Sequence, residues 1–130
     1  MSRVVLDAGA LIALDRGARP VWVLLETIRA ARRPLITHAG IIAQVWRNPA
    51  RQARLARVLQ MLEVQVLDEP VARAAGVLLT RAGTGDVHDA VLALVCRPGD
   101  TLVTSDHDDL RRLLAARREV PGLSWIENPS

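Results

Sequence analysis

Residues 4–7 (VVLD) form a short apolar run that ends in a carboxylate, and this run most constrains the fold of the chain. A buried strand that passes directly into a helix explains both the apolar run and the small residues at 8–10. In open parallel sheets, ligands bind and chemistry occurs at the carboxyl ends of the strands. A carboxylate that is desolvated at such an edge needs a cation or hydrogen-bond donors beside it. We therefore expect Asp7 to belong to a site that other parts of the chain complete.

Strand-like and helix-like segments alternate along the rest of the chain, which is typical of a parallel α/β architecture. After the first strand, we predict strands at 34–37, 63–67, 101–104 and 123–127, the last of them at an edge of the sheet. We predict helices at 9–16, 18–33, 40–47, 49–62, 69–82, 86–96 and 106–118. The sequence therefore predicts one domain over residues 1–130, a three-layer α/β/α sandwich whose central, mostly parallel sheet has about five strands.

Length and composition are those of a single globular domain, because 130 residues with 50% hydrophobic side chains can bury a full core. No apolar stretch approaches the roughly 20 residues that a transmembrane helix needs, so we expect no membrane partner. The first strand begins almost at once, so we expect no signal peptide. Cys96 is the only cysteine and cannot form a disulfide within the chain. We expect a cytoplasmic protein.

All 17 basic residues are arginines, and the formal net charge is +3. Arginine binds phosphate groups with a planar fork of donors, which favours a phosphate-rich partner such as RNA. A bias in the base composition of the gene also produces an arginine-rich and alanine-rich chain, so charge alone leaves the partner open. The basic run at 47–57 has the same two interpretations, a solvated helix face or a surface that follows RNA. Its members are Arg47, Arg51, Arg54 and Arg57.

Further aspartates occur where other predicted elements begin or end. They are Asp86 and Asp89 at the start of helix 86–96, and Asp106, Asp108 and Asp109 after strand 101–104. If the first and fourth strands are neighbours, Asp7 and Asp106 lie side by side at the carboxyl edge of the sheet. Two carboxylates about 4 Å apart repel by about 4 kcal/mol at an effective dielectric of about 20, so their gathering favours Mg²⁺ or Mn²⁺. Such ions activate water for the hydrolysis of phosphodiesters.

These residues also have structural interpretations. Asp86 and Asp106 stand where aspartate is favoured as a helix N-cap, and Asp108 and Asp109 would complement the positive end of a helix. Asp7 and Asp89 are the hardest to explain in this way, because each lies next to an apolar segment. The histidines are His38, His88 and His107. They lack the close spacing of zinc ligands, such as a pair four residues apart on a helix.

Three segments together resemble the corresponding motifs of PIN-domain proteins, and in particular of the VapC-type toxins of bacterial toxin–antitoxin pairs. They are residues 4–12 (VVLDAGALI), 86–90 (DVHDA) and 103–110 (VTSDHDDL). The resemblance implies an endoribonuclease that depends on Mg²⁺ or Mn²⁺, is neutralised by a small antitoxin and commonly forms a homodimer. It also implies that Trp22 and Trp46 border the antitoxin groove and the dimer surface, although core packing is the better interpretation for at least one of them.

The resemblance assigns roles residue by residue. The first, third and fourth acids of the family fall on Asp7, Asp89 and Asp106, which would hold the metal ion. Asp86 joins them as a further catalytic candidate, and Asp109 is a supporting acid. The family's second acid, a glutamate, is replaced here by Gln44.

Glutamine keeps the size of glutamate and one carbonyl oxygen, but it carries no charge and cannot act as a general base. Gln44 therefore leaves two hypotheses, a metal-dependent ribonuclease or a degenerate PIN module that binds RNA or a partner protein without cleavage. The structural interpretation of Gln44 is a polar residue that faces solvent on a helix. A phosphotransferase with an aspartyl nucleophile is disfavoured, because no second aspartate stands two residues after Asp7 and the chain has no lysine.

Overall fold

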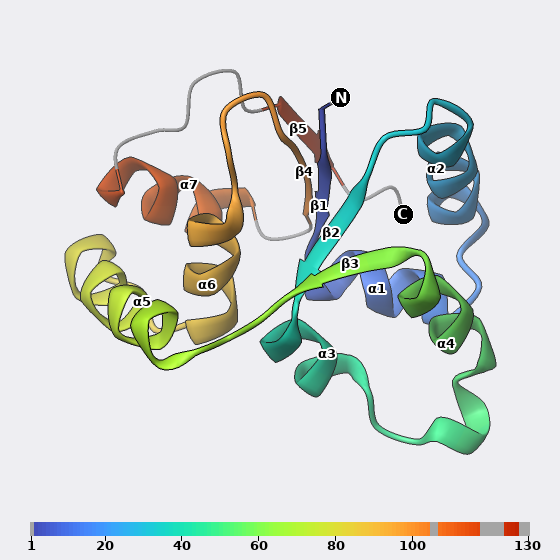
Figure 1. Cartoon of the computed structure of the whole chain (residues 1–130), viewed down its shortest axis with the longest axis horizontal. Helices are drawn as coiled ribbons and strands as arrows, with labels where there is room; N and C mark the ends of the chain where they lie inside the picture. Colours follow the sequence, from blue (N-terminus) through green and yellow to red (C-terminus); the bar gives the residue numbers. More distant parts are fainter. Residues whose placement is uncertain (1, 105–106, 118–123, 128–130) are drawn as a thin grey trace.

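The computed structural model describes residues 2–104, 107–117 and 124–127, and these form alternating strands and helices around one sheet (Figure 1). The strands are β1 (Val4–Leu6), β2 (Leu35–His38), β3 (Leu62–Gln65), β4 (Thr101–Thr104) and β5 (Ser124–Glu127). The α-helices are α1 (Ala8–Asp15), α2 (Arg19–Ala30), α3 (Ala39–Val45), α4 (Ala53–Gln60), α5 (Glu69–Ala82), α6 (Val87–Val95) and α7 (His107–Ala116). A short 3₁₀ helix, η1 (Pro49–Arg51), precedes α4.

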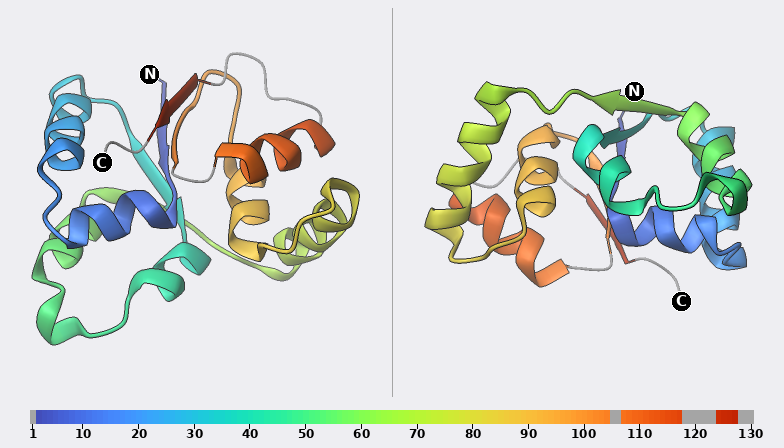
Figure 2. Two further views of the ribbon diagram at one scale, coloured as in Figure 1. Left: turned by 180° about the vertical axis from the view of Figure 1, so that it is seen from behind. Right: turned by 90° about the horizontal axis from the view of Figure 1, so that it is seen from below.

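The sheet has the strand order β3-β2-β1-β4-β5, and every pair of neighbours is parallel. Helices α5, α6 and α7 cover one face, whereas α1, α2 and α4 cover the other (Figures 1 and 2). Helix α3 lies near the carboxyl edge of the sheet, where it contacts both α1 and α6. The predicted three-layer sandwich is therefore confirmed, as are the adjacency of β1 and β4 and the edge position of the last strand.

Strand β1 lies at the centre of the sheet and is buried on both faces. Val4 and Val5 have no exposed surface and Leu6 is 3% exposed. A strand covered by helices on both faces has no polar side, which is why its sequence is continuously apolar instead of alternating. The chain that leaves β1 therefore carries Asp7 out of the most buried part of the protein.

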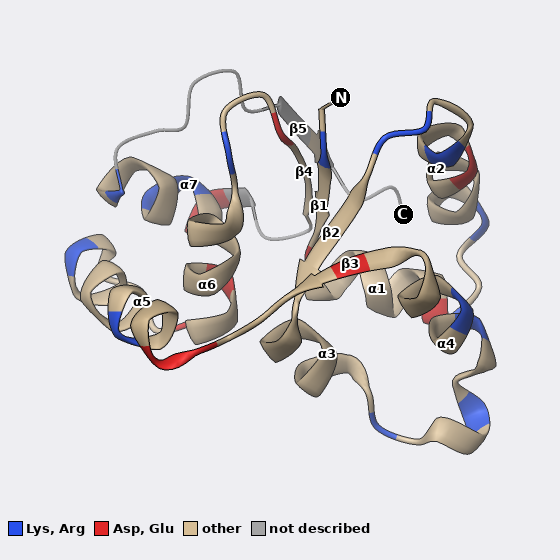
Figure 3. Ribbon diagram, viewed as in Figure 1, with Lys and Arg blue, Asp and Glu red and all other residues tan. Residues whose placement is uncertain are grey.

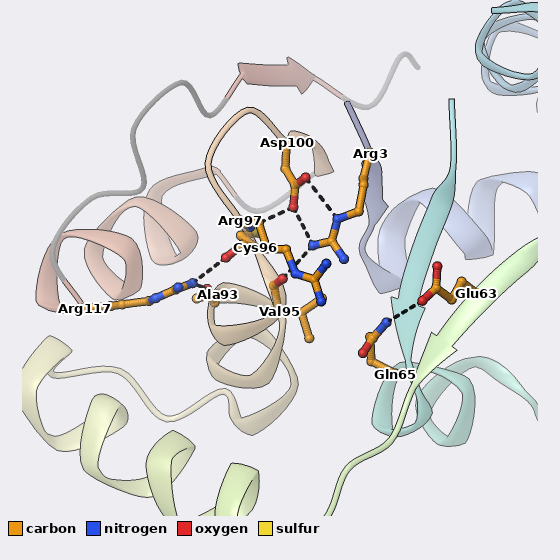
Figure 4. Close-up of polar contacts among 9 residues, drawn as sticks. All are labelled: Arg3, Glu63, Gln65, Ala93, Val95, Cys96, Arg97, Asp100 and Arg117. Carbon is orange, nitrogen blue, oxygen red and sulfur yellow. Dashed lines mark hydrogen bonds and ion pairs between the residues drawn. The ribbon is translucent and has the colours of Figure 1, made fainter. Parts of the chain in front are cut away.

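At the amino end of the sheet, an ion pair fixes the connection from α6 to β4 (Figure 4). The Arg3 guanidinium donates to both carboxylate oxygens of Asp100, over 3.1 and 2.7 Å, and to the Val95 carbonyl over 2.9 Å. Asp100, which is 2% exposed, also accepts a hydrogen bond from the backbone N–H of Arg97 over 2.8 Å. The hydrogen bond to Asp100 raises the pKa of Arg3 above its usual value. Arginine and aspartate thus satisfy one another in a place that is mostly closed to water.

A second arginine, Arg117, follows α7 and contacts the carboxyl end of α6. Its guanidinium donates to the carbonyls of Ala93 and Cys96. These carbonyls belong to the last turn of α6, where they lack partners within the helix. Burial raises the pKa of the Cys96 thiol to about 12, so this cysteine behaves as a small apolar core residue.

The helix predicted at 49–62 is confirmed over α4 and is wrong at its ends, because the chain breaks at Gln52 between η1 and α4 and enters β3 at Leu62. The Gln52 side chain is 6% exposed. Its Oε1 accepts from the backbone N–H groups of Arg47 and Asn48 over 2.8 and 2.9 Å. Its Nε2 donates to the Val45 carbonyl and to Asp15 Oδ2 over 2.9 and 3.0 Å. A continuous helix would remove this amide from the loop whose backbone it satisfies.

The other predicted elements agree with the structure to within a few residues. Helix 69–82 and strand 101–104 have the predicted bounds. The helix expected at 18–33 is shorter and ends at Ala30, because Arg32 adopts a positive φ of 55° shortly before Pro34. Within the part of the chain that the structure describes, no helix has both the length and the apolar character needed to cross a bilayer.

We expect Gln52→Ala to lower the free energy of unfolding by about 2–4 kcal/mol, because it removes four hydrogen bonds and leaves buried backbone groups unsatisfied. Urea denaturation followed by circular dichroism measures this loss. The matched control is Gln60→Ala at the exposed end of α4, which we expect to change stability by less than about 0.5 kcal/mol. Equal stability of the two variants would contradict the role given to Gln52.

Candidate metal centre at the carboxyl edge of the sheet

Asp7 lies directly after β1 and is 3% exposed. Its backbone N–H donates to the Val103 carbonyl of β4 over 3.2 Å, which continues the pairing of the two strands. Its Oδ1 accepts from the backbone N–H of Ala10 over 2.8 Å, so Asp7 is also the N-cap of α1. The positive end of a helix stabilises a carboxylate at this position. Strand pairing and helix capping together fix both the backbone and the orientation of this acid.

Asp86 and Asp89 begin α6. Asp86 is the half-buried N-cap, and its Oδ1 accepts from the backbone N–H of Asp89 over 3.0 Å. Asp89 is in the first turn of the helix and is 7% exposed. The structural interpretation of Asp86 as a cap is therefore confirmed. The burial of Asp89 is not explained by capping, since Asp86 already provides the cap.

Two hydrogen bonds connect the chain next to Asp7 with the chain next to Asp89. Thr37 Oγ1 donates to the carbonyl of Leu6, the residue before Asp7, over 3.1 Å. His38 Nε2 lies 3.0 Å from the carbonyl of His88, the residue before Asp89. Because Thr37 and His38 are consecutive residues of β2, this strand holds both acids at the same edge of the sheet.

His38 has a structural role that the spacing of the histidines, which bears only on zinc binding, does not predict. It is fully buried and is the N-cap of α3, with Nδ1 accepting from the backbone N–H of Gly40 over 3.0 Å. Burial lowers the pKa of His38, which favours the neutral ring. The signal available in the sequence was its place between a predicted strand and a predicted helix, where caps occur.

The remaining predicted site residues are placed as follows. Gln44 is half-buried in the last turn of α3, and Asp109 is half-buried in the first turn of α7, beside the exposed Asp108. Asp106 lies outside the described residues, as does its neighbour Ser105. The strand register pairs Leu6 with Val103, so Asp7 stands level with Thr104, two positions before Asp106 in the sequence. That Asp7, Asp89 and Asp106 share a metal ion stays a prediction.

The donors at this edge are the carboxylate oxygens of Asp7 and Asp89, with the amide of Gln44 on the neighbouring helix α3. Hard cations such as Mg²⁺ and Mn²⁺ take oxygen ligands of this kind, so the chemistry of the residues fits such an ion. Within residues 2–104, 107–117 and 124–127, no three His, Cys, Asp or Glu side chains gather closely enough to hold a metal ion. The third predicted ligand, Asp106, is not among those residues.

The basic run at 47–57 is exposed: Arg47 precedes η1, and the other three arginines lie in η1 and α4, where Figure 3 shows basic segments in blue. Within it, the Arg57 guanidinium lies 6.0 Å from the centre of the Trp22 ring. Trp22 donates from Nε1 to the Leu14 carbonyl over 2.9 Å, and both Trp22 and Trp46 pack half-buried against the core. Core packing is thus confirmed for both tryptophans.

The fold is similar to those of solved VapBC structures. The crystal structure of VapBC2 from Rickettsia felis bound to a DNA fragment from their promoter contains a chain with TM-score 0.65 and 17% identity, covering 95% of this chain and 97% of that one. The DNA-bound VapBC from Salmonella typhimurium gives TM-score 0.56 and 17% identity, over 99% and 100% of the two chains. PAE2754 from Pyrobaculum aerophilum gives TM-score 0.55 and 22% identity, over 98% and 91%.

Sequence comparison adds no relative to these structures. No protein-family model matches the chain, and no curated protein matches it. The similarity is therefore one of backbone architecture, and it extends over nearly the whole length of each pair of chains. The chain therefore shares its fold with chains of these two VapBC structures and with PAE2754.

Proposed function

We propose that the protein is an endoribonuclease that depends on Mg²⁺ or Mn²⁺ and serves as the toxin of a VapBC-type toxin–antitoxin pair. The observation that carries this proposal is the burial of Asp7 and Asp89 at one edge of the sheet, 3% and 7% exposed. Two desolvated carboxylates at one edge of a sheet are unfavourable unless positive charge or hydrogen bonds compensate them. The amino ends of α1 and α6 supply part of that compensation, and a divalent cation would add to it.

In this proposal, Asp7, Asp89 and Asp106 hold the cation, with Asp86, Gln44 and Asp109 in support. When bound, the cation makes a water molecule more acidic and offsets negative charge that develops on a phosphodiester. The chain's own residues fix the geometry. The bond from Ala10 N–H orients the Asp7 carboxylate, and Asp86 holds the backbone that carries Asp89. Acids held in this way need little reorganisation when a substrate arrives.

The proposed partners follow from the fold and from the charge of the chain. Structures of VapBC bound to DNA are among those that the chain resembles, which supports an antitoxin as a partner. The exposed arginines of η1 and α4 would bind the phosphates of an RNA substrate. A homodimer and a cytoplasmic location also belong to the proposal.

A second candidate function, a PIN module that binds RNA or a partner without cleavage, is favoured by Gln44. This residue stands in the last turn of α3, the helix that contacts both α1 and α6. An amide there leaves the site one negative charge short of four acids. The expected consequence is a lower affinity for the cation, and cleavage would fall with it.

Asp7→Asn should reduce RNA cleavage in the presence of Mn²⁺ by about 100-fold or more, because it removes the charge of a metal ligand. A quenched fluorescent RNA measures the rate. Asparagine still caps a helix, so the fold should persist. The matched control is Asp68→Asn, which changes the exposed N-cap of α5, whose Oδ1 accepts from Val71 N–H over 3.1 Å. Cleavage by the Asp7 variant at the wild-type rate would contradict the assignment.

Gln44→Glu should strengthen Mn²⁺ binding by about 10-fold, since it adds a negative charge to the proposed site. Isothermal titration calorimetry measures the affinity, and the same RNA assay measures the gain in cleavage. Gln60→Glu adds an equal charge at the exposed end of α4 and should change neither. An unchanged affinity would mean that Gln44 does not face the cation. RNA binding without cleavage by both wild type and Gln44→Glu would favour the non-cleaving module.

A further inference from the structure

The imidazole of His38 makes a hydrogen bond from each of its two ring nitrogens. Nδ1 accepts from the backbone N–H of Gly40 at the start of α3, over 3.0 Å. Because an acceptor nitrogen carries no proton, the ring proton of the neutral form is on Nε2. That nitrogen lies 3.0 Å from the His88 carbonyl in the first turn of α6 and donates to it. One buried ring thus joins the end of β2, the start of α3 and the start of α6.

The surroundings of His38 leave little room for another arrangement. A Cβ atom at Gly40 would lie 2.8 Å from both His38 Cε1 and His88 Nδ1, so glycine permits this close approach. The rings of His38 and His88 are stacked, with centroids 6.1 Å apart and planes inclined by 27°. The side chain of His38 has no exposed surface. The ring of His38 therefore lies between the start of α3 and the start of α6.

We propose that His38 is a positioning residue, which sets the first turn of α6, and with it Asp89, relative to the sheet edge that carries Asp7. Its neighbour Thr37 donates to the carbonyl of Leu6 and so positions the end of β1, directly before Asp7. The inference rests on the proposed function because it assumes that the position of Asp89 matters for cation binding. Metal–oxygen distances tolerate deviations of only about 0.2 Å, so a small shift of α6 weakens a shared ion.

Histidine is suited to this position because one ring nitrogen caps α3 while the other bonds a carbonyl of α6. Serine, threonine or asparagine would accept from the Gly40 N–H as an ordinary N-cap. Their side chains are too short to reach a carbonyl on a second helix at the same time. Glutamine places an amide N–H at about the distance of histidine Nε2, so it retains the longer contact. Asparagine at this position therefore keeps the cap of α3 and loses the bond to α6, whereas glutamine keeps the bond to α6.

The test compares His38→Asn with His38→Gln. We expect His38→Asn to weaken Mn²⁺ binding at least about 10-fold, as the loss of supporting contacts around metal sites typically does, and His38→Gln to recover part of the affinity. The control is Asp100→Asn, which weakens the ion pair with Arg3 at the amino end of the sheet and should leave the Mn²⁺ affinity of the folded protein unchanged. Isothermal titration calorimetry gives the affinity, and circular dichroism gives the folded fraction. An unchanged affinity in His38→Asn, or a loss no greater than in Asp100→Asn, overturns the proposal.

Nuclear magnetic resonance without metal separates this inference from the proposed function. His38→Asn should move the amide resonances of His88 and Asp89, and His38→Gln should leave them nearer their wild-type positions. If they do not move, the positioning role fails whether or not the protein binds Mn²⁺. If they move but the wild type binds no Mn²⁺, the proposed function fails and the positioning role stands.

The ¹⁵N shifts of the wild-type His38 ring need no variant. A proton on Nε2 is expected, and a proton on Nδ1 would overturn the proposal.

Discussion

The parallel pairing of β1 with β2 on one side and β4 on the other is the constraint on which the rest of the structure depends. It buries Val4, Val5 and Leu6 completely or nearly so, and it leaves Asp7 at the first point where the chain can meet polar groups. The bond from Asp7 N–H to the Val103 carbonyl extends this pairing by one step. Because parallel strands end at the same edge, the acid after β1 and the segment after β4 are brought to one side of the sheet.

Buried polar side chains connect several loops to this sheet through hydrogen bonds. The Arg3–Asp100 ion pair holds the loop before β4, and the Gln52 side chain bonds the loop before α4. His38 connects β2 with two helices. Each of these groups makes several hydrogen bonds, which offsets the cost of removing it from water. Such contacts are directional, so they fix the geometry of the loops more narrowly than apolar packing does.

Two acids of the proposed site have a structural role in addition to the chemical role that we propose for them. Asp7 and Asp86 are both N-caps, and capping by itself would explain an exposed aspartate such as Asp68. What distinguishes Asp7 is burial beside the centre of the sheet, and what distinguishes Asp89 is burial without a capping duty. This combination favours a cation site over purely structural aspartates. Gln44 weakens the negative field of such a site and keeps the non-cleaving alternative open.

Much of the fold was predictable from the sequence, because the periodicity of apolar residues follows directly from which face of an element is buried. The strand before Asp7, the helix Glu69–Ala82 and the strand Thr101–Thr104 are examples. Local capping signals also placed Asp86 correctly. The break at Gln52 was not predictable from the apolar pattern, since the Gln52 side chain bonds the backbone of the loop at 45–48 and also reaches Asp15, 37 positions away.

The sequence by itself thus determined the order of the elements, the burial of the central strand and the types of residue available to the site. The tertiary structure alone decided that the dipeptide Thr37-His38 holds the residues before Asp7 and Asp89 together. It also decided that Gly40 makes room for two histidine rings. The physical reason is that these contacts join residues about 30 to 50 positions apart, and no local pattern encodes which distant carbonyl a side chain will meet.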